Sequence, residues 1–147
     1  MDDALKARLD AIEGREQIRE LPARYVWASA RADAVAMVAL FTEDCDFEMG
    51  PPGSRVQLKG KAALLELLTR MAPTPGVILA LISNQTVEMQ GPDTASGTCV
   101  MQNPAAPPAN SPFVGYYRDE FRRVGGTWLF RARRFWSYSP LFDPSGS

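Results

Sequence analysis

The chain has 147 residues, of which 46% are hydrophobic and 22% are charged, and its formal net charge is -1. This length and composition predict one globular domain over residues 1–147. Without a positive field we expect no nucleic acid and no membrane surface as a partner. No apolar run approaches the roughly 20 residues of a membrane span, and the N-terminus lacks a signal-peptide pattern, so we expect a cytoplasmic protein.

Helical patterns dominate the first 40 residues. Pro22 lies inside the apolar pattern of this segment and predicts a kink, and the residues before Gly14 are expected to form a shorter helix of their own. Asp33 precedes the apolar run 34–38, as an N-cap residue precedes a helix. Apolar side chains at three- and four-residue steps would form one helix face: Ile18, Leu21, Tyr25, Ala28 and Ala32.

Strand patterns fill most of the remaining sequence. Residues 44–49 alternate between acidic and apolar side chains, which is typical of a strand with one buried face. A helix is expected to begin at Gly60 and to end before the Pro-rich segment 73–76. Other strands are expected at 56–58, 77–89, 94–102, 113–124 and 127–138. Together these elements predict an α+β fold with a mostly antiparallel sheet.

The turn Gly125-Gly126 fixes the expected pairing of the last two strands, because positions across a two-residue turn have a constant sum. Asp119 would then lie opposite Ala132, and Tyr117 opposite Arg134. All four side chains would lie on the face of the hairpin that carries more large apolar residues, which is the face expected to point inward. A β-bulge would turn the other face inward.

The chain contains no histidine, the one side chain whose unperturbed pKa lies between pH 5 and 8. Acid–base catalysis would therefore need a carboxyl, phenol or thiol with a shifted pKa. Asp119, buried on an apolar face, could be a general base, with Arg134 stabilising an enolate or phenolate; the alternative is a structural ion pair. Tyr25 could donate to a leaving hydroxyl or oxyanion, or be a core aromatic residue.

Two further polar residues have two interpretations each. Asn84 could orient a ligand carbonyl or occupy a strand irregularity. Cys99 lies between apolar neighbours and is interpreted as an inert buried thiol, with a pocket or nucleophilic role as the alternative.

The segment Asn103–Pro112 could be a lid or a rigid connector. Several bulky residues could line a pocket or fill the core: Phe47, Met49, Met101, Tyr117, Trp27, Trp136 and Tyr138.

No metal site and no cofactor are expected. The chain lacks histidine, inward clusters of carboxylates and a Gly-rich phosphate loop, which are the usual means of binding zinc, iron or nucleotides.

The order of several short segments resembles the SnoaL-like family of the nuclear-transport-factor-2-like superfamily, which includes scytalone dehydratase and the bile-acid dehydratases. The resemblance covers residues 12–136 and implies a cone-shaped, curved sheet wrapped around the N-terminal helices, and a homodimer. The segments are Arg24-Tyr25, Asp33, Leu40–Asp44, Leu58–Lys61, Asn84, Gly91, Gly115–Phe121, Gly126–Trp128 and Arg133.

The chain departs from the family at the usual catalytic pair. Family enzymes often carry an aspartate five residues after the helix tyrosine, where this chain has Ala30. The usual histidine positions correspond to Ala80 or Ser83, and to Cys99. The resemblance also favours Arg133 as the inward arginine.

The leading hypothesis is a cofactor-free lyase, dehydratase or isomerase that acts on a small apolar, aromatic or polycyclic substrate. Asp119 and Tyr25 would transfer protons, with Arg134 or Arg133 as the electrostatic partner. Because the family's catalytic pair is absent, one alternative is a non-catalytic domain that binds small molecules. A second is a structural dimerisation module whose cone is filled by its own side chains.

Overall fold

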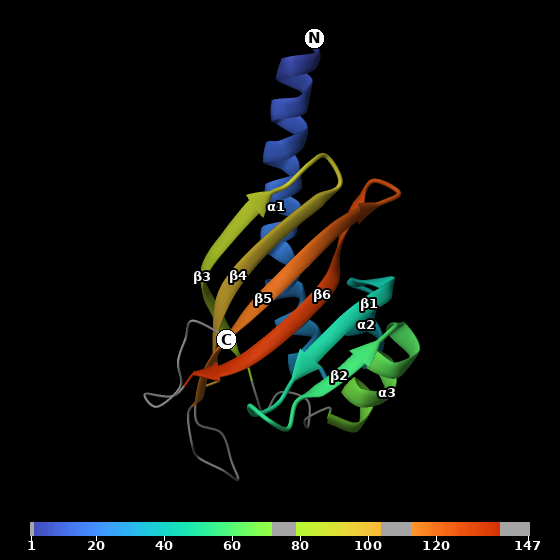
Figure 1. The fold of residues 1–147 in the computed structure, drawn as a ribbon, viewed down its shortest axis with the longest axis vertical. Coiled ribbons are helices and arrows are strands. Elements are labelled where there is room, and N and C mark those ends of the chain that lie inside the picture. The colour runs from blue at the N-terminus through green and yellow to red at the C-terminus, as the bar shows by residue number, and fades with distance from the viewer. Residues whose placement is uncertain (1, 72–78, 104–112, 139–147) are drawn as a thin grey trace.

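The computed structural model describes residues 2–71, 79–103 and 113–138. Its strands form one sheet in the order β2-β1-β6-β5-β4-β3 (Figure 1). Strands β1 and β6 are parallel, and the other neighbouring pairs are antiparallel. In chain order the elements are α1 (Asp3–Ala30), α2 (Ala34–Val38), β1 (Phe41–Met49), β2 (Val56–Lys59), α3 (Lys61–Met71), β3 (Leu81–Met89), β4 (Thr94–Asn103), β5 (Phe113–Val124) and β6 (Thr127–Tyr138).

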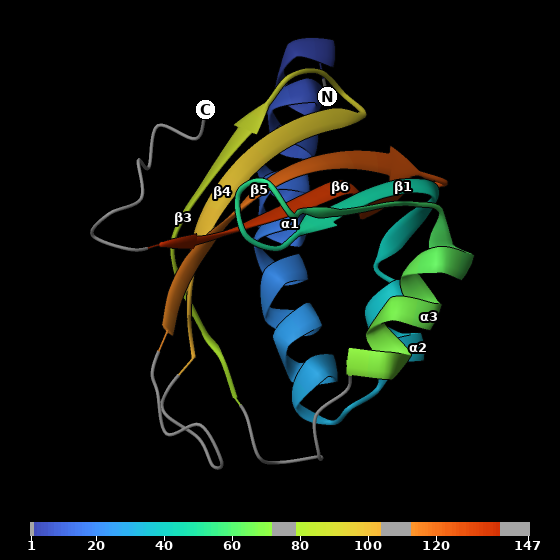
Figure 2. The same ribbon diagram turned by 60° about the horizontal axis from the view of Figure 1, so that its bottom comes forward.

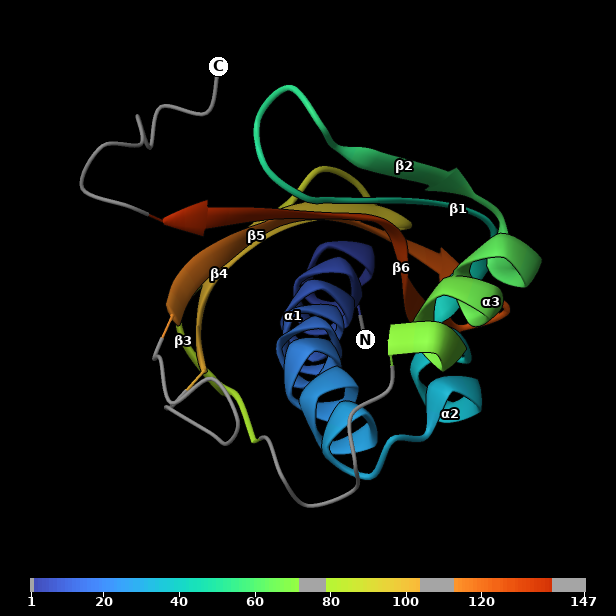
Figure 3. The same cartoon turned by 90° about the horizontal axis from the view of Figure 1, so that it is seen from below.

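The sheet is strongly curved, and α1 lies along its concave side (Figure 2). Helices α2 and α3 lie beside α1 at the end of the sheet that carries β1 and β2, as the view from below shows (Figure 3). This arrangement confirms the predicted α+β fold. No helix in the described ranges is long and apolar enough to cross a membrane.

Helix α1 is one continuous helix, so the expected separate helix before Gly14 is wrong. Asp2 caps it by accepting a hydrogen bond from the Leu5 backbone N–H at 2.7 Å. The helix continues through Gly14 and Pro22, which are both buried. Burial of one helix face against the sheet outweighs the local penalties of glycine and proline.

The shorter elements follow the expected local signals. Asp33 caps α2, accepting from the Ala36 backbone N–H at 3.0 Å. In β1, Cys45 and Phe47 are buried, while Asp46 between them is more exposed. Strand β3 begins at Leu81. Residues 77–78 of the expected strand and residues 104–112 of the possible lid Asn103–Pro112 lie outside the described residues.

A β-bulge shifts the register of the final hairpin. Gly125 and Gly126 both have positive φ, and Phe121 pairs with Phe130 as predicted. Arg131 is then an extra residue on β6, and the pairing moves by one position between Phe121 and Glu120.

Beyond the bulge, Asp119 lies opposite Arg133 and Tyr117 opposite Phe135. The expectation that Arg134 turns inward is therefore wrong, because a bulge reverses which side chains face the core. Arg133 is the inward arginine.

Candidate functional site

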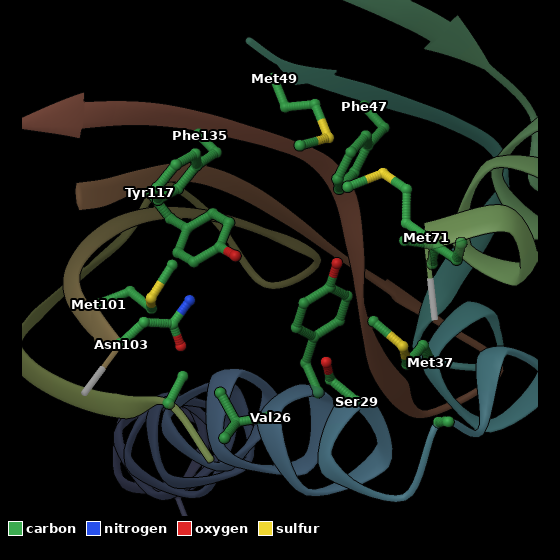
Figure 4. A pocket seen from close by; sticks show the side chains of 14 residues that line it. Val26, Ser29, Met37, Phe47, Met49, Met71, Met101, Asn103, Tyr117 and Phe135 are labelled. Atoms are coloured by element: carbon green, nitrogen blue, oxygen red, sulfur yellow. The ribbon is translucent and has the colours of Figure 1, made fainter. Parts of the chain in front are cut away.

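A cavity of about 300 Å³ lies between the C-terminal half of α1 and the concave face of the sheet. Its wall is mostly apolar and includes four methionines, whose flexible thioethers adapt to differently shaped ligands. Most of these side chains are seen in the close view (Figure 4). The lining residues are Tyr25, Val26, Ser29, Ala32, Met37, Phe47, Met49, Leu68, Met71, Ala80, Met101, Asn103, Tyr117 and Phe135.

The polar groups of the wall are neutral. They come from Tyr25 and Ser29 on α1, Asn103 at the end of β4 and Tyr117 on β5. Within the described part of the chain, no Asp, Glu, Lys or Arg lines the cavity. The wall therefore offers hydrogen bonds but no fixed charge to a ligand.

The two tyrosines meet edge to face, with ring centroids 6.4 Å apart. Burial is the main reason that the pKa of each phenol is raised, although the nearby Arg133 lowers both. Both are thus neutral donors at physiological pH. Figure 4 shows the Tyr117 hydroxyl pointing into the cavity.

Behind this wall lies a buried ion pair between Arg133 and Asp119. Their side chains are 0% and 2% exposed, and Arg133 Nε donates to Asp119 Oδ1 at 3.1 Å. The guanidinium carbon lies 3.5 Å from the centre of the Tyr117 ring and 4.6 Å from that of Tyr25. The two phenols are therefore in contact with a buried positive charge.

The charge states of this pair follow from burial and from each other. Burial raises the pKa of Asp119 to about 6, although Arg133 pulls it down. Burial alone would lower the pKa of Arg133, but Asp119 and the neighbouring tyrosines outweigh it and raise the value. Arg133 is therefore always charged. Among the described residues, nothing accepts a hydrogen bond from its Nη1.

The structure brings five predicted residues to the cavity wall: Tyr25, Tyr117, Phe47, Met49 and Met101. Asp119 and Arg133 lie behind the wall instead. Cys99 lies there too, 1% exposed, and its Sγ accepts from Arg133 Nη2 at 3.7 Å. Burial raises the pKa of this thiol to about 11, so it stays protonated.

Three predicted residues lie away from the cavity. Arg134 lies on the other face of β6, where Nη1 donates to a Glu120 carboxylate oxygen at 2.8 Å. Asn84 is exposed with φ +51° at the irregularity in β3, which fits the alternative interpretation of that residue. The Trp136 ring stacks on Arg55, 3.5 Å from the guanidinium carbon, one residue beyond cavity-lining Phe135.

Other wall residues were not singled out from the sequence as site residues. Ser29 follows Tyr25 by one helical turn, so the helix periodicity could have found it. Met37 belongs to the apolar run of α2 and was readable as core. Asn103 carried no local signal, because its place on the wall depends on where β4 ends and on the curvature of the sheet.

No cluster in the described ranges combines three His, Cys, Asp or Glu side chains in a geometry that could hold a metal ion.

Comparison with known proteins places the chain in a family. The model of the SnoaL-like domain matches residues 10–134. The chain belongs to the SnoaL-like family. No match was found among curated proteins.

Solved structures share the SnoaL-like fold. A nuclear-transport-factor-2-like protein with a cystatin-like fold from Novosphingobium aromaticivorans is 30% identical, with 95% of this chain and 93% of that chain covered and a TM-score of 0.78. A second protein from that organism, proposed to be a scytalone dehydratase, is 18% identical over 88% and 87% of the two chains, with a TM-score of 0.76. A hexachlorocyclohexane dehydrochlorinase is 18% identical over 95% and 99%, with a TM-score of 0.70. The last two similarities concern the fold alone.

Proposed function

We propose that this SnoaL-like protein is a cofactor-free lyase or isomerase that acts on a small, mostly apolar molecule in the cavity between α1 and the sheet. The observation that carries the proposal is the pair of cavity-lining phenols in contact with a buried guanidinium. The fold is also that of a proposed scytalone dehydratase and of a dehydrochlorinase, so it is compatible with this reaction class. An apolar wall with a few placed polar groups is the usual form of a small-molecule site.

Tyr117 is the proposed acid and base. Its hydroxyl donates a proton to a substrate oxygen on which negative charge develops, as in the loss of a hydroxyl group. The phenolate that remains lies beside the Arg133 guanidinium, which stabilises its charge. The phenolate then accepts the proton that leaves the adjacent substrate carbon, so that Tyr117 is regenerated. This cycle requires no histidine.

Asp119 takes a different role from the one expected from sequence. Its carboxylate is bound by Arg133 and does not line the cavity, so it is not placed to take a proton from the substrate. We assign it as a positioning residue, which holds the guanidinium against the Tyr117 ring. Tyr25 is the second donor, available to a carbonyl or enolate oxygen of the same substrate.

The test is product analysis by mass spectrometry of phenolic, polyketide-like and steroid-like compounds incubated with the purified protein. We expect a compound that loses water or is isomerised, and at least about a hundredfold slower conversion by Tyr117→Phe, the usual cost of losing an oxyanion donor. Tyr116→Phe is the matched control, since Tyr116 neighbours Tyr117 on β5 but does not line the cavity. Equal conversion by Tyr117→Phe and the wild type would refute the assignment.

A non-catalytic binding domain is the second candidate. It is favoured by one observation, the lack of a charged acid or base on the described cavity wall. It predicts that compounds are retained by the protein and recovered unchanged, with equal retention by the wild type and Tyr116→Phe.

A further inference from the structure

Two long stretches of the sequence contain no charged side chain, although 22% of the residues of the chain are charged. They are residues 71–87 and residues 94–117, which include no Asp, Glu, Lys or Arg. The structure brings them together at one end of the sheet, because the start of β3 pairs with the end of β4, which pairs with the start of β5 (Figure 2). Several residues of these stretches line the cavity: Met71, Ala80, Met101, Asn103 and Tyr117.

The edge of the cavity on this side is apolar. Met71, the last residue of α3, lines the cavity and is 48% exposed. Leu79 and Leu81, which flank the cavity-lining Ala80, are 42% and 55% exposed. These side chains can contact an apolar molecule that enters the cavity, but they offer no counter-ion to a charged one.

The charged groups that adjoin the wall come in pairs of opposite sign. Arg133, behind the wall, is balanced by Asp119 at 3.1 Å. At the end of α1, Arg31 and Asp33 carry opposite charges and flank the cavity-lining Ala32. An ion that entered the cavity would therefore lose its hydration without gaining a counter-ion from the described wall, and burial of an unpaired ion is costly.

We propose that the cavity selects uncharged substrates and excludes molecules whose enclosed part carries a carboxylate, a phosphate or an ammonium group. This inference rests on the proposed function, because it concerns the substrate of the same cavity, and it adds the charge class of that substrate. A neutral substrate enters without the loss of ionic hydration. Negative charge then develops only during the reaction, beside the phenols, so that electrostatic stabilisation acts on the transition state rather than on the bound substrate.

The test uses two pairs of unreactive probes, each matched in shape and different in charge at pH 7. The first pair is neutral 2-naphthamide and anionic 2-naphthoate, and the second is neutral 2-naphthylmethanol and cationic 2-naphthylmethylammonium. Titration calorimetry gives their dissociation constants with the wild type, Ser29→Lys and Ala23→Lys. Ser29→Lys adds an ammonium group to the wall from α1. Ala23→Lys is the matched control, because Ala23 is exposed on the same helix and does not line the cavity.

We expect the wild type and Ala23→Lys to bind each neutral probe at least about tenfold more tightly than its charged counterpart, because the ion loses hydration that nothing on the wall replaces. Ser29→Lys should bind 2-naphthoate at least about tenfold more tightly than the wild type does, since its ammonium group pairs with the carboxylate. The same substitution should not improve binding of the cationic probe. Circular dichroism verifies the fold of both variants, and the wild-type comparison decides alone if Ser29→Lys does not fold.

Three results would each overturn the proposal: a smaller preference for the neutral probes in the wild type, no binding of either neutral probe, or no gain for 2-naphthoate in folded Ser29→Lys. Failure of the catalytic proposal looks different, since the preference for neutral probes would persist while Tyr117→Phe left turnover unchanged.

Discussion

Arg133 and Asp119 differ in how each can respond when its partner is removed. Arginine keeps its charge at all accessible pH values, whereas a carboxyl can take up a proton. Both side chains are almost fully enclosed. A lone Arg133 would thus be a buried, uncompensated charge, while a lone Asp119 could become a neutral acid.

This difference predicts unequal costs for the two single substitutions. Asp119→Leu removes both the charge and the oxygen that even a protonated Asp119 would keep as an acceptor for Arg133. It should lower the free energy of unfolding by about 3–5 kcal/mol, as is usual when one member of a buried pair is lost. Arg133→Met should cost clearly less, and the double variant should recover much of the loss. Urea denaturation at pH 7 measures all three. Equal losses in the two single variants would contradict the prediction.

The raised pKa of Asp119 also predicts a pH dependence of stability. Its carboxyl has a pKa of about 6 in the folded protein, against 3.8 for an aspartate in water, so the native state holds more protons than the unfolded chain between these two pH values. The resulting stabilisation is complete below pH 3.8 and is lost as the pH rises through 6. The total is up to about 3 kcal/mol.

The measurement compares unfolding free energies of the wild type and the Asp119→Leu/Arg133→Met variant from pH 4 to pH 7. Because other titrating groups are shared, their contributions cancel in the difference. The stability of the wild type relative to the variant should fall across this range. A constant difference would mean that Asp119 does not titrate there.

The hairpin register derived from the sequence placed Arg134 on the inner face, whereas Arg133 is the arginine that faces the core. The turn residues determined the hairpin register only as far as Phe130. Beyond it, Arg131 is the extra residue of a bulge, and nothing in the surrounding arginines marks which of them leaves the ladder. Tyr117 and Asp119 were predicted to face inward because β5 keeps its alternation throughout, and they do.

At the scale of elements, α1 depends on close contact with the sheet at Gly14. A Cβ atom there would lie 2.8 Å from Trp128 Nε1 and 3.3 Å from Met89 Cε. Trp128 is only 3% exposed and has little room to move. Gly14 thus permits the approach of α1 to β6.

We predict that Gly14→Ala lowers the free energy of unfolding by about 1–3 kcal/mol, because overpacking outweighs the gain of about 1 kcal/mol in helix propensity. Glu13→Ala, at an exposed neighbouring position, should change stability little. The midpoints of urea denaturation test both. A more stable Gly14→Ala variant would show that the helix can shift away from Trp128.

Most elements were predictable because periodicity and turn residues agree along the chain. Alternation and the glycine turn predicted β5 and β6 to the residue, and Asp33 marked the start of α2. That α1 is one continuous helix was not predictable. Gly14 and Pro22 both have low helix propensity, and only tertiary packing compensates for that cost. The cavity likewise depends on sheet curvature, which local patterns do not encode.

For the whole molecule, the homodimer implied by the family resemblance stays a prediction. Charged residues of β1, β5 and β6 outside the core already pair within the chain, for example Arg131 with Asp46 and Arg134 with Glu120. A dimer formed through these residues would therefore rely on packing more than on new ion pairs. We expect light scattering after size exclusion to give twice the chain mass at both low and high salt. A single-chain mass at both would exclude the dimer.

The stacking of Arg133 on Tyr117 has a consequence for spectroscopy. A guanidinium held 3.5 Å above an aromatic ring lies in the shielding zone of the ring current. Its Nε–H resonance should therefore appear far upfield of those of the other arginines, and burial should slow its exchange with water. Any ligand that tilts the tyrosine ring would move this isolated signal, so the protein carries its own internal reporter of cavity occupancy.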